Sequence, residues 1–117
     1  MRTINETIEM YVEGTRTGDV NLLRKVFHEK AVMSGELFGM KMIVDSPEHF
    51  FKDIAGEKAA SNYEYGYEIL KEVKDIAVVE LNERNLKSAN FSNLFQLQKI
   101  EDDWYITSKL FTSLEVL

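Results

Sequence analysis

The second half of the sequence is patterned as a series of β-strands, and this pattern constrains the fold more than any other feature. Tyr63, Tyr65, Tyr67 and Ile69 alternate with glycine or glutamate at the strand period of two. Three more segments have the composition of strands, namely Ile76–Arg84, Phe91–Ile100 and Trp104–Phe111. Short turn sequences separate the segments, such as Lys74-Asp75. Four strands at hairpin spacing predict an antiparallel meander.

The first residues are patterned as helices. Apolar side chains and one threonine at positions 4, 8, 11, 12 and 15 fall on one face of a helix over residues 3–17. Gly18 is placed to end that helix in a left-handed conformation. Asp19 is a suitable N-cap for a second, short helix. Two short helices around this turn predict a helical hairpin.

Between the two halves, the pattern predicts two strands and a third helix. The strands, Ala31–Ser34 and Glu36–Val44, are expected to meet in a tight turn near Gly35. Ser46 as N-cap and Pro47 at the first helical position would start the third helix. The order α-α-β-β-α-β-β-β-β indicates an α+β fold in which helices cover one face of a curved antiparallel sheet. We expect a single domain over residues 1–117, because the sequence contains no linker.

Composition excludes several classes of protein. The chain has no cysteine, which excludes a disulfide scaffold, a thiolate zinc site and a cysteine nucleophile. Its formal net charge of −6 argues against nucleic acid as a partner. No apolar run approaches the roughly 20 residues of a membrane span, and glutamates interrupt the first helix where a signal peptide would be apolar. We therefore expect a cytoplasmic protein that binds neither nucleic acid nor membrane.

Two strings of the sequence resemble the nuclear-transport-factor-2-like superfamily, and within it the SnoaL-like family called putative lumazine-binding. The string Tyr11–Met33 is similar to that family's helical hairpin and the turn after it, and Asn90–Phe111 is similar to its last hairpin. The chain departs from the family at Asn93, where an aspartate is common, and at Asp103, where the turn usually has glycine. Asparagine cannot act as a general base, so this departure counts against catalysis.

The resemblance implies a cone-shaped fold. The sheet of such proteins curls around the helices, leaves a pocket at its open end, and commonly forms a homodimer through its outer face. Members include isomerases, dehydratases, cyclases and hydrolases, and many have no known activity. Fold does not settle function in such a family.

The candidate catalytic residues are His28 and Glu80. His28 follows the second predicted helix and either points into the mouth of the cone or binds the carbonyls at that helix end, and the second role is favoured. Glu80 interrupts an apolar stretch. It would be a pocket base if it faced inward, where burial shifts the pKa of a carboxyl, and a solvated acid if it faced outward, which is favoured.

The candidate ligand-binding residues are mostly large or polar side chains at helix and strand positions that could face the cone, namely Tyr11, Met33, Phe38, Asn93, Trp104 and Lys109. Lys109 could neutralise an anionic ligand or pair with a carboxylate across the sheet, and the ion pair is favoured. Asn93 would act as a hydrogen-bonding group. Methionine and aromatic side chains could furnish adaptable apolar walls, although they more often form core.

Three functions remain open. The first is a pocket for a small, largely apolar molecule, without catalysis. The second is an isomerase, dehydratase or hydrolase that uses His28 or Glu80 and no cofactor. The third is an assembly module with a filled cavity. The sequence shows no phosphate-binding glycine loop, no HExxH motif and no Gly-x-Ser-x-Gly elbow, so neither a cofactor nor a metal is expected.

Overall fold

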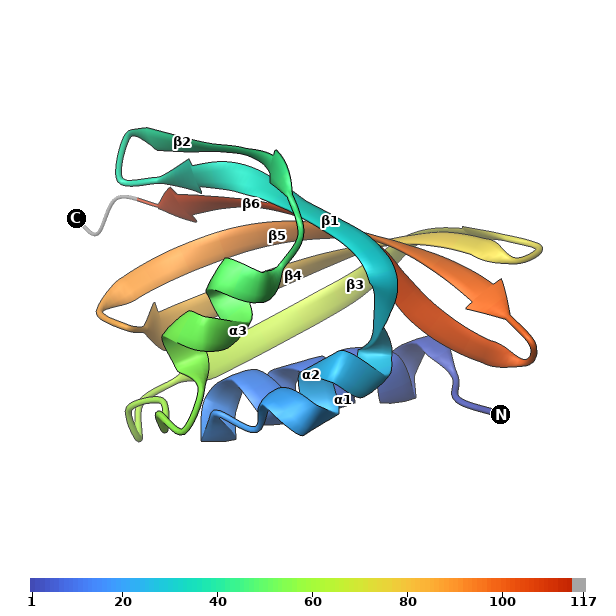
Figure 1. Ribbon diagram of the computed structural model, residues 1–117, viewed down its shortest axis with the longest axis horizontal. Helices are drawn as coiled ribbons and strands as arrows, with labels where there is room; N and C mark the ends of the chain where they lie inside the picture. The colour runs from blue at the N-terminus through green and yellow to red at the C-terminus, as the bar shows by residue number, and fades with distance from the viewer. Residues whose placement is uncertain (115–117) are drawn as a thin grey trace.

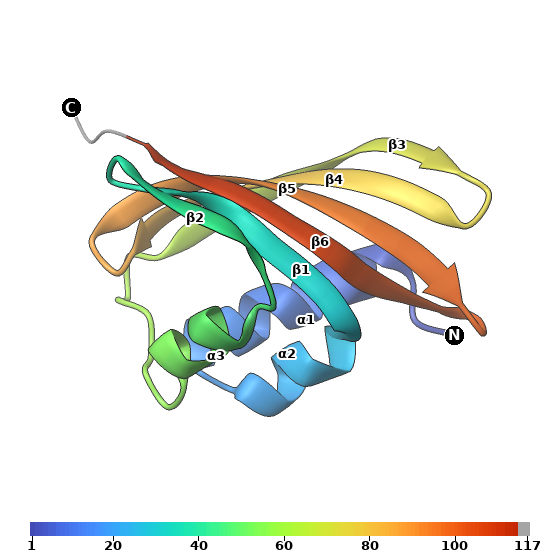
Figure 2. The ribbon, with the colours of Figure 1, turned by 45° about the horizontal axis from the view of Figure 1, so that its top comes forward.

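The computed structural model describes residues 1–114, and its elements follow the predicted order. The helices are α1 (Ile4–Thr17), α2 (Val20–Val26) and α3 (Glu48–Ile54), and the strands are β1 (Phe27–Leu37), β2 (Met40–Asp45), β3 (Glu64–Val73), β4 (Ile76–Leu86), β5 (Ala89–Ile100) and β6 (Asp103–Leu114). The strands form one curved sheet that is not closed, with the helices against its concave face (Figures 1 and 2). This confirms the α+β cone.

The order of strands across the sheet is β2-β1-β6-β5-β4-β3. All neighbouring pairs are antiparallel except β1 and β6, which run parallel. These two strands lie far apart in the sequence, so no hairpin dictates their direction. Their contact joins the N-terminal β-hairpin to the C-terminal meander and makes one continuous sheet.

The helical hairpin forms around the predicted turn at Gly18 and Asp19, and a capping box starts its first helix. The Thr3 hydroxyl accepts a hydrogen bond from the Glu6 backbone N–H, and the Glu6 carboxylate accepts one from the Thr3 backbone N–H, both at 3.1 Å. Gly18 has φ 73°, and Asp19 caps α2. The segment after α3 packs on this turn, since a Cβ on Gly18 would lie 2.5 Å from the Glu57 backbone nitrogen. Glycine is therefore needed at position 18.

Two of the predicted boundaries in the middle of the chain are wrong. The turn between β1 and β2 lies at Phe38-Gly39, not at Gly35. Gly35 lies inside β1, and glycine is needed there because a Cβ would overlap the carbonyl oxygen of Phe111 on β6. Helix α3 begins at Glu48, with Pro47 as a cap that makes no side-chain hydrogen bond.

Strands β4 and β5 both extend beyond the predicted bounds Ile76–Arg84 and Phe91–Ile100, into the polar residues between them. Strand β4 continues to Leu86, and β5 begins at Ala89. The two residues between them, Lys87 and Ser88, both have positive φ, which is the geometry of a tight hairpin turn. Glu83 lies within β4, as it does in the predicted strand Ile76–Arg84.

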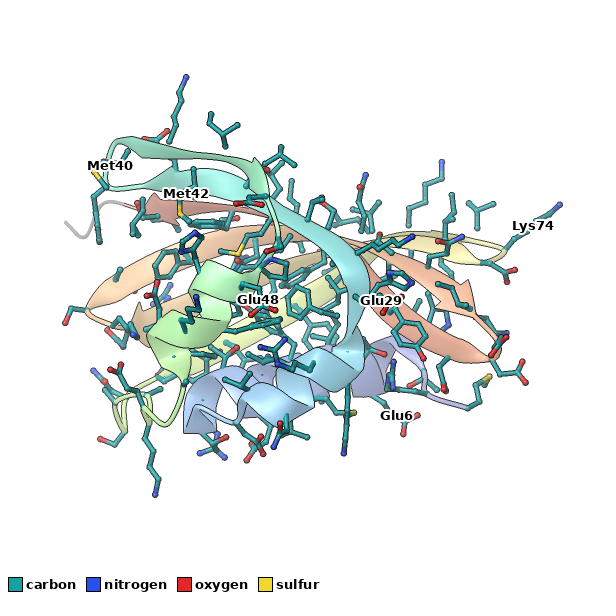
Figure 3. The ribbon with its side chains drawn as sticks, in the orientation of Figure 1. Glu6, Glu29, Met40, Met42, Glu48 and Lys74 are labelled. Atoms are coloured by element: carbon teal, nitrogen blue, oxygen red, sulfur yellow. The ribbon has the colours of Figure 1, made fainter. Side chains whose placement is uncertain are left out.

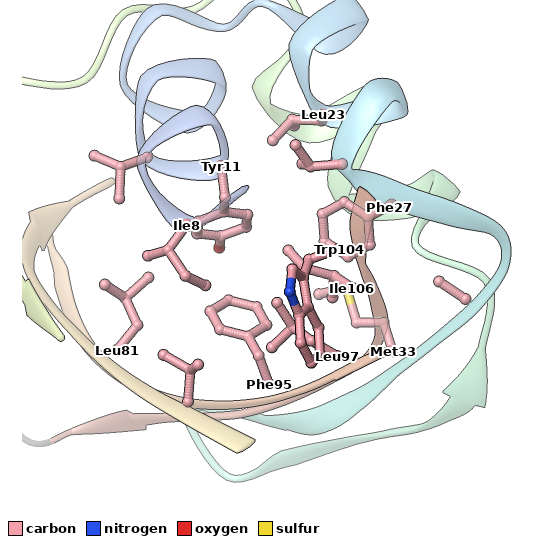
Figure 4. Packing of buried hydrophobic residues seen from close by; sticks show 14 of the residues in the cluster. Ile8, Tyr11, Leu23, Phe27, Met33, Leu81, Phe95, Leu97, Trp104 and Ile106 are labelled. Atoms are coloured by element: carbon pink, nitrogen blue, oxygen red, sulfur yellow. The ribbon is translucent and has the colours of Figure 1, made fainter. Parts of the chain in front are cut away.

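The core fills the part of the cone between α1 and the centre of the sheet. Ile8 and Tyr11 of α1 face Phe95 and Leu97 of β5 (Figure 4), and all four are at most 2% exposed. The tyrosine row of β3 also faces α1, where Tyr65 donates to Glu9 at 2.6 Å and Tyr67 donates to Asn5 at 3.1 Å. None of the helices in residues 1–114 is both long enough and apolar enough to cross a membrane.

Candidate functional site

A cavity of about 190 Å³ lies at the open end of the cone. It is bounded by the β1–β2 hairpin, by α3 and by the β4–β5 hairpin, which lie together at one end of the molecule (Figure 1). Its lining residues are Met33, Leu37, Phe38, Met42, Phe50, Asp53, Ile54, Glu83, Leu86, Lys87, Ala89, Phe91, Lys109 and Phe111. Most of these side chains are apolar. The volume is below the roughly 300 Å³ of sites for drug-sized ligands, so the cavity suits a molecule of few heavy atoms.

Lys109 of β6 is one of two buried charged groups in the cavity wall, with 4% of its surface exposed. Its Nζ donates a hydrogen bond to the Tyr11 hydroxyl at 2.9 Å and lies 3.6 Å from the centroid of the Phe50 ring. It forms no ion pair within residues 1–114. Burial lowers the pKa of Lys109 to about 8, although the negative charge of Glu83 acts in the opposite direction.

Glu83 of β4 is the second buried charged group, with 2% of its surface exposed. One carboxylate oxygen accepts a hydrogen bond from the Tyr63 hydroxyl and the other accepts one from the Asn93 amide, both at 2.8 Å. The Asn93 amide also donates to the Leu81 carbonyl at 3.1 Å. Hydrogen bonds of this kind stabilise a buried carboxylate.

The two tyrosines of the site stay protonated at neutral pH. Burial raises the pKa of the Tyr11 phenol well above its usual value, and the charge of Glu83 adds to this. Burial and the same carboxylate raise the pKa of Tyr63 as well. Both phenols can therefore act as hydrogen-bond donors. The site is an apolar cavity over a polar floor, which we define as Tyr11, Tyr63, Glu83, Asn93 and Lys109.

The structure brings five of the six predicted ligand-binding residues to this region. Met33, Phe38 and Lys109 line the cavity, and Tyr11 and Asn93 belong to the floor through Lys109 and Glu83. Trp104 lies elsewhere. It is buried near the N-terminus, where its backbone N–H donates to the Arg2 carbonyl at 3.1 Å.

The two candidate catalytic residues lie outside the cavity wall. His28 is half-buried at the start of β1, its Nδ1 accepts a hydrogen bond from the Lys30 backbone N–H at 3.0 Å, and its ring packs edge-on against Tyr105. Glu80 alternates with the buried residues of β4, so it faces the outer side of the sheet beside Glu68 and Leu94. The structure therefore places neither residue where it could contact a ligand in the cavity.

Glu83 is the functional candidate that the sequence interpretation missed. Its parity with the buried Val79 and Leu81 was a usable signal, because alternate residues of a strand share a face. Polar neighbours on both sides of Glu83 masked this signal, whereas Glu80 stood out because it interrupts an apolar stretch. Among the residues the structure describes, no group of three or more His, Asp or Glu side chains could hold a metal ion.

The family model described as putative lumazine-binding matches residues 1–112. None of the curated proteins matches this sequence. Among solved structures, an NTF2-like protein of unknown function from Methylobacillus flagellatus KT has a TM-score of 0.87 at 20% identity, covering 96% of this chain and 90% of its own. A second, from Silicibacter pomeroyi DSS-3, has a TM-score of 0.84 at 20% identity, with 95% and 92% covered.

A ketosteroid isomerase-like protein from Erwinia carotovora atroseptica SCRI1043 is also similar, with a TM-score of 0.69 at 17% identity, covering 97% of this chain and 95% of its own. At these identities the likeness shows the fold alone. The overlap along nearly the whole chain confirms the predicted cone fold of the NTF2-like type.

The substitution Asn93→Asp tests the polar floor. It replaces the amide that donates to Glu83 with a second carboxylate at the same place. Like charges at that distance raise the carboxyl pKa of the pair, so the folded variant retains a proton that the unfolded chain has lost at pH 7. Its free energy of unfolding should therefore fall as the pH rises, with a loss of about 3 kcal/mol at pH 7 that shrinks toward pH 5.

The matched control is Asn82→Asp, at an exposed position on the outer face of β4. Urea denaturation of both variants between pH 5 and pH 8 gives the comparison. Identical pH profiles for the two variants would contradict the proposed contact between Asn93 and Glu83.

Proposed function

This chain belongs to the family called putative lumazine-binding, and we propose that it binds a small, largely apolar molecule in the cavity at the open end of its cone. The observation that carries this proposal is the apolar wall over a polar floor in one cavity. Apolar walls supply most of the affinity in such sites, and a few fixed polar groups orient the ligand. Lys109 and Glu83 supply those groups here.

The charges of the floor favour a neutral ligand. Lys109 and Glu83 are opposite in charge, both line the cavity, and each already has hydrogen-bonding partners from the protein. A charged ligand would be attracted by one of them and repelled by the other. Around the floor, Phe50 and Phe111 offer ring surfaces, and Met33 is an adaptable neighbour. These contacts suit a neutral aromatic or conjugated molecule that has one polar group.

The geometry does not support the enzyme that uses His28 or Glu80, because both side chains lie away from the cavity. The assembly module with a filled cavity is disfavoured by the space that remains between α3 and the two hairpins. Binding is therefore the function that the site supports best.

The methionine methyl groups offer a direct test of binding. In protein labelled with 13C at these methyls, benzyl alcohol should shift the signals of Met33 and Met42 with saturation, because both side chains line the cavity. The signals of Met1 and Met10 should not move.

The substitution Met42→Trp should fill the mouth of the cavity and weaken the binding of benzyl alcohol at least about tenfold, which corresponds to a loss of about 1.4 kcal/mol in binding free energy.

The matched control is Met40→Trp, on the same strand at an exposed position outside the cavity wall (Figure 3). Its affinity for benzyl alcohol should equal that of the unchanged protein. The proposal fails if the methyl signals of Met33 and Met42 do not shift, or if all five methyls shift in proportion to ligand concentration without saturation.

We also propose that two copies of the chain form a homodimer through the outer face of the sheet. Leu94 and Leu110 are directly paired across β5 and β6 and are each nearly half exposed, and Val32 of β1 is exposed on a nearby strand. Adjacent exposed apolar side chains of this kind often mark interfaces.

Sedimentation of the unchanged protein should show a dimer, and the substitution Leu110→Glu should dissociate it. A monomer at every concentration of the unchanged protein would contradict this proposal.

A further inference from the structure

Lys109 has hydrogen-bonding capacity that the protein does not use. An ammonium group carries three N–H donors, and one of those of Lys109 is bound by the Tyr11 hydroxyl. The Phe50 ring covers another side of Nζ, and no carboxylate forms an ion pair with it within residues 1–114. The side chain lines the cavity, so a ligand there can reach Nζ.

The same surroundings make the amine reactive. A lysine in an apolar site is a nucleophile because desolvation favours its neutral form. With its pKa lowered to about 8, about a tenth of Lys109 is neutral at pH 7, against less than about one part in a thousand for an ordinary lysine. Lys109 thus combines an amine, a cavity that a ligand can enter and a neighbouring phenol.

We propose that Lys109 captures small aldehydes or ketones that enter the cavity, as a Schiff base on Nζ. The proposal rests on the proposed function, because the carbonyl compound must first bind in that cavity. The polar group of the ligand is then a carbonyl. A free N–H of Lys109 would bind its oxygen and so place the carbonyl carbon beside Nζ.

The reaction needs no oxidant or reductant. Nζ gives up a proton, its lone pair adds to the carbonyl carbon, and a C–N bond forms in a carbinolamine. The C–O bond then breaks, and the oxygen departs as water with two protons that came from Nζ. The Tyr11 hydroxyl, 2.9 Å from Nζ, is placed to relay a proton to that oxygen. One ammonium and one carbonyl become one iminium and one water, so charge is conserved.

The groups around Nζ can hold the iminium product. From β4, Glu83 supplies a negative charge in the same cavity wall, and from α1, Tyr11 supplies the hydroxyl. The other charged groups that line the cavity are Asp53 of α3 and Lys87 of the β4–β5 turn. A cationic iminium replaces a cationic ammonium, so the balance of charge with Glu83 is preserved.

The test uses benzaldehyde and cyanoborohydride, which reduces an iminium to a stable benzyl amine. At pH 7, peptide mapping by mass spectrometry should show Lys109 labelled at least about tenfold faster than Lys71, an exposed lysine of β3. The labelling rate of Lys109 should level off above pH 8, whereas that of Lys71 should keep rising. Benzyl alcohol should slow the labelling of Lys109 alone.

The variant Lys109→Met should lose the fast-labelled site, and the control Lys71→Met should keep it. Peptide mapping of the unchanged protein decides the matter if Lys109→Met does not fold. Labelling of surface lysines with Lys109 unmodified, together with saturable binding of benzyl alcohol, would overturn the Schiff base and leave the proposed function standing. Absence of both Lys109 labelling and benzyl alcohol binding would overturn both.

Discussion

The site depends on the burial of two opposite charges that do not form an ion pair with each other. Lys109 has Tyr11 and the Phe50 ring as its partners, while Glu83 has Tyr63 and Asn93. Burying a charge is costly unless hydrogen bonds or an opposite charge compensate it. Because each charge is stabilised from the protein side, both remain in the cavity wall and can contact a ligand.

The shape of the sheet makes this arrangement possible. Its centre curves around α1 and excludes water with packed side chains (Figure 4), while its far end has only the short α3 to cover it. There the Lys87 ammonium binds the Asp53 carbonyl and pairs with Glu57 at 2.8 Å, so the β4–β5 hairpin is tied to α3 at the rim. An exposed pair of this kind contributes little to stability, and its main effect is to fix the edge of the cavity.

Local chemistry determined which features could be predicted from the sequence. The cap at Asp19 and the left-handed Gly18 depend on neighbouring residues, and the structure has both. Gly35 suggested a turn, but its small size serves the approach of β6, a contact between residues far apart in the chain. Long-range contacts of this kind leave no local pattern.

Only part of the site could be predicted from the sequence, because its contacts are also long-range. Lys109 and Asn93 could be chosen as site residues because the resemblance marked their strands, yet their partners come from elements distant in sequence. The expected ion pair of Lys109 is absent within residues 1–114 because a phenol and an aromatic ring occupy its surroundings. Glu83 lies within the predicted strand, but its polar neighbours gave no local sign that its side chain is buried.

The most direct measurement is the titration of Lys109 itself. In protein labelled with 13C and 15N at lysine, the Cε and Nζ signals of Lys109, assigned with Lys109→Met, should move with a midpoint near pH 8. That result would show an amine buried in an apolar wall without a contacting carboxylate. A midpoint at or above the usual lysine value of about 10.4 would contradict the central claim, because it would mean that Lys109 is solvated or paired with an acid.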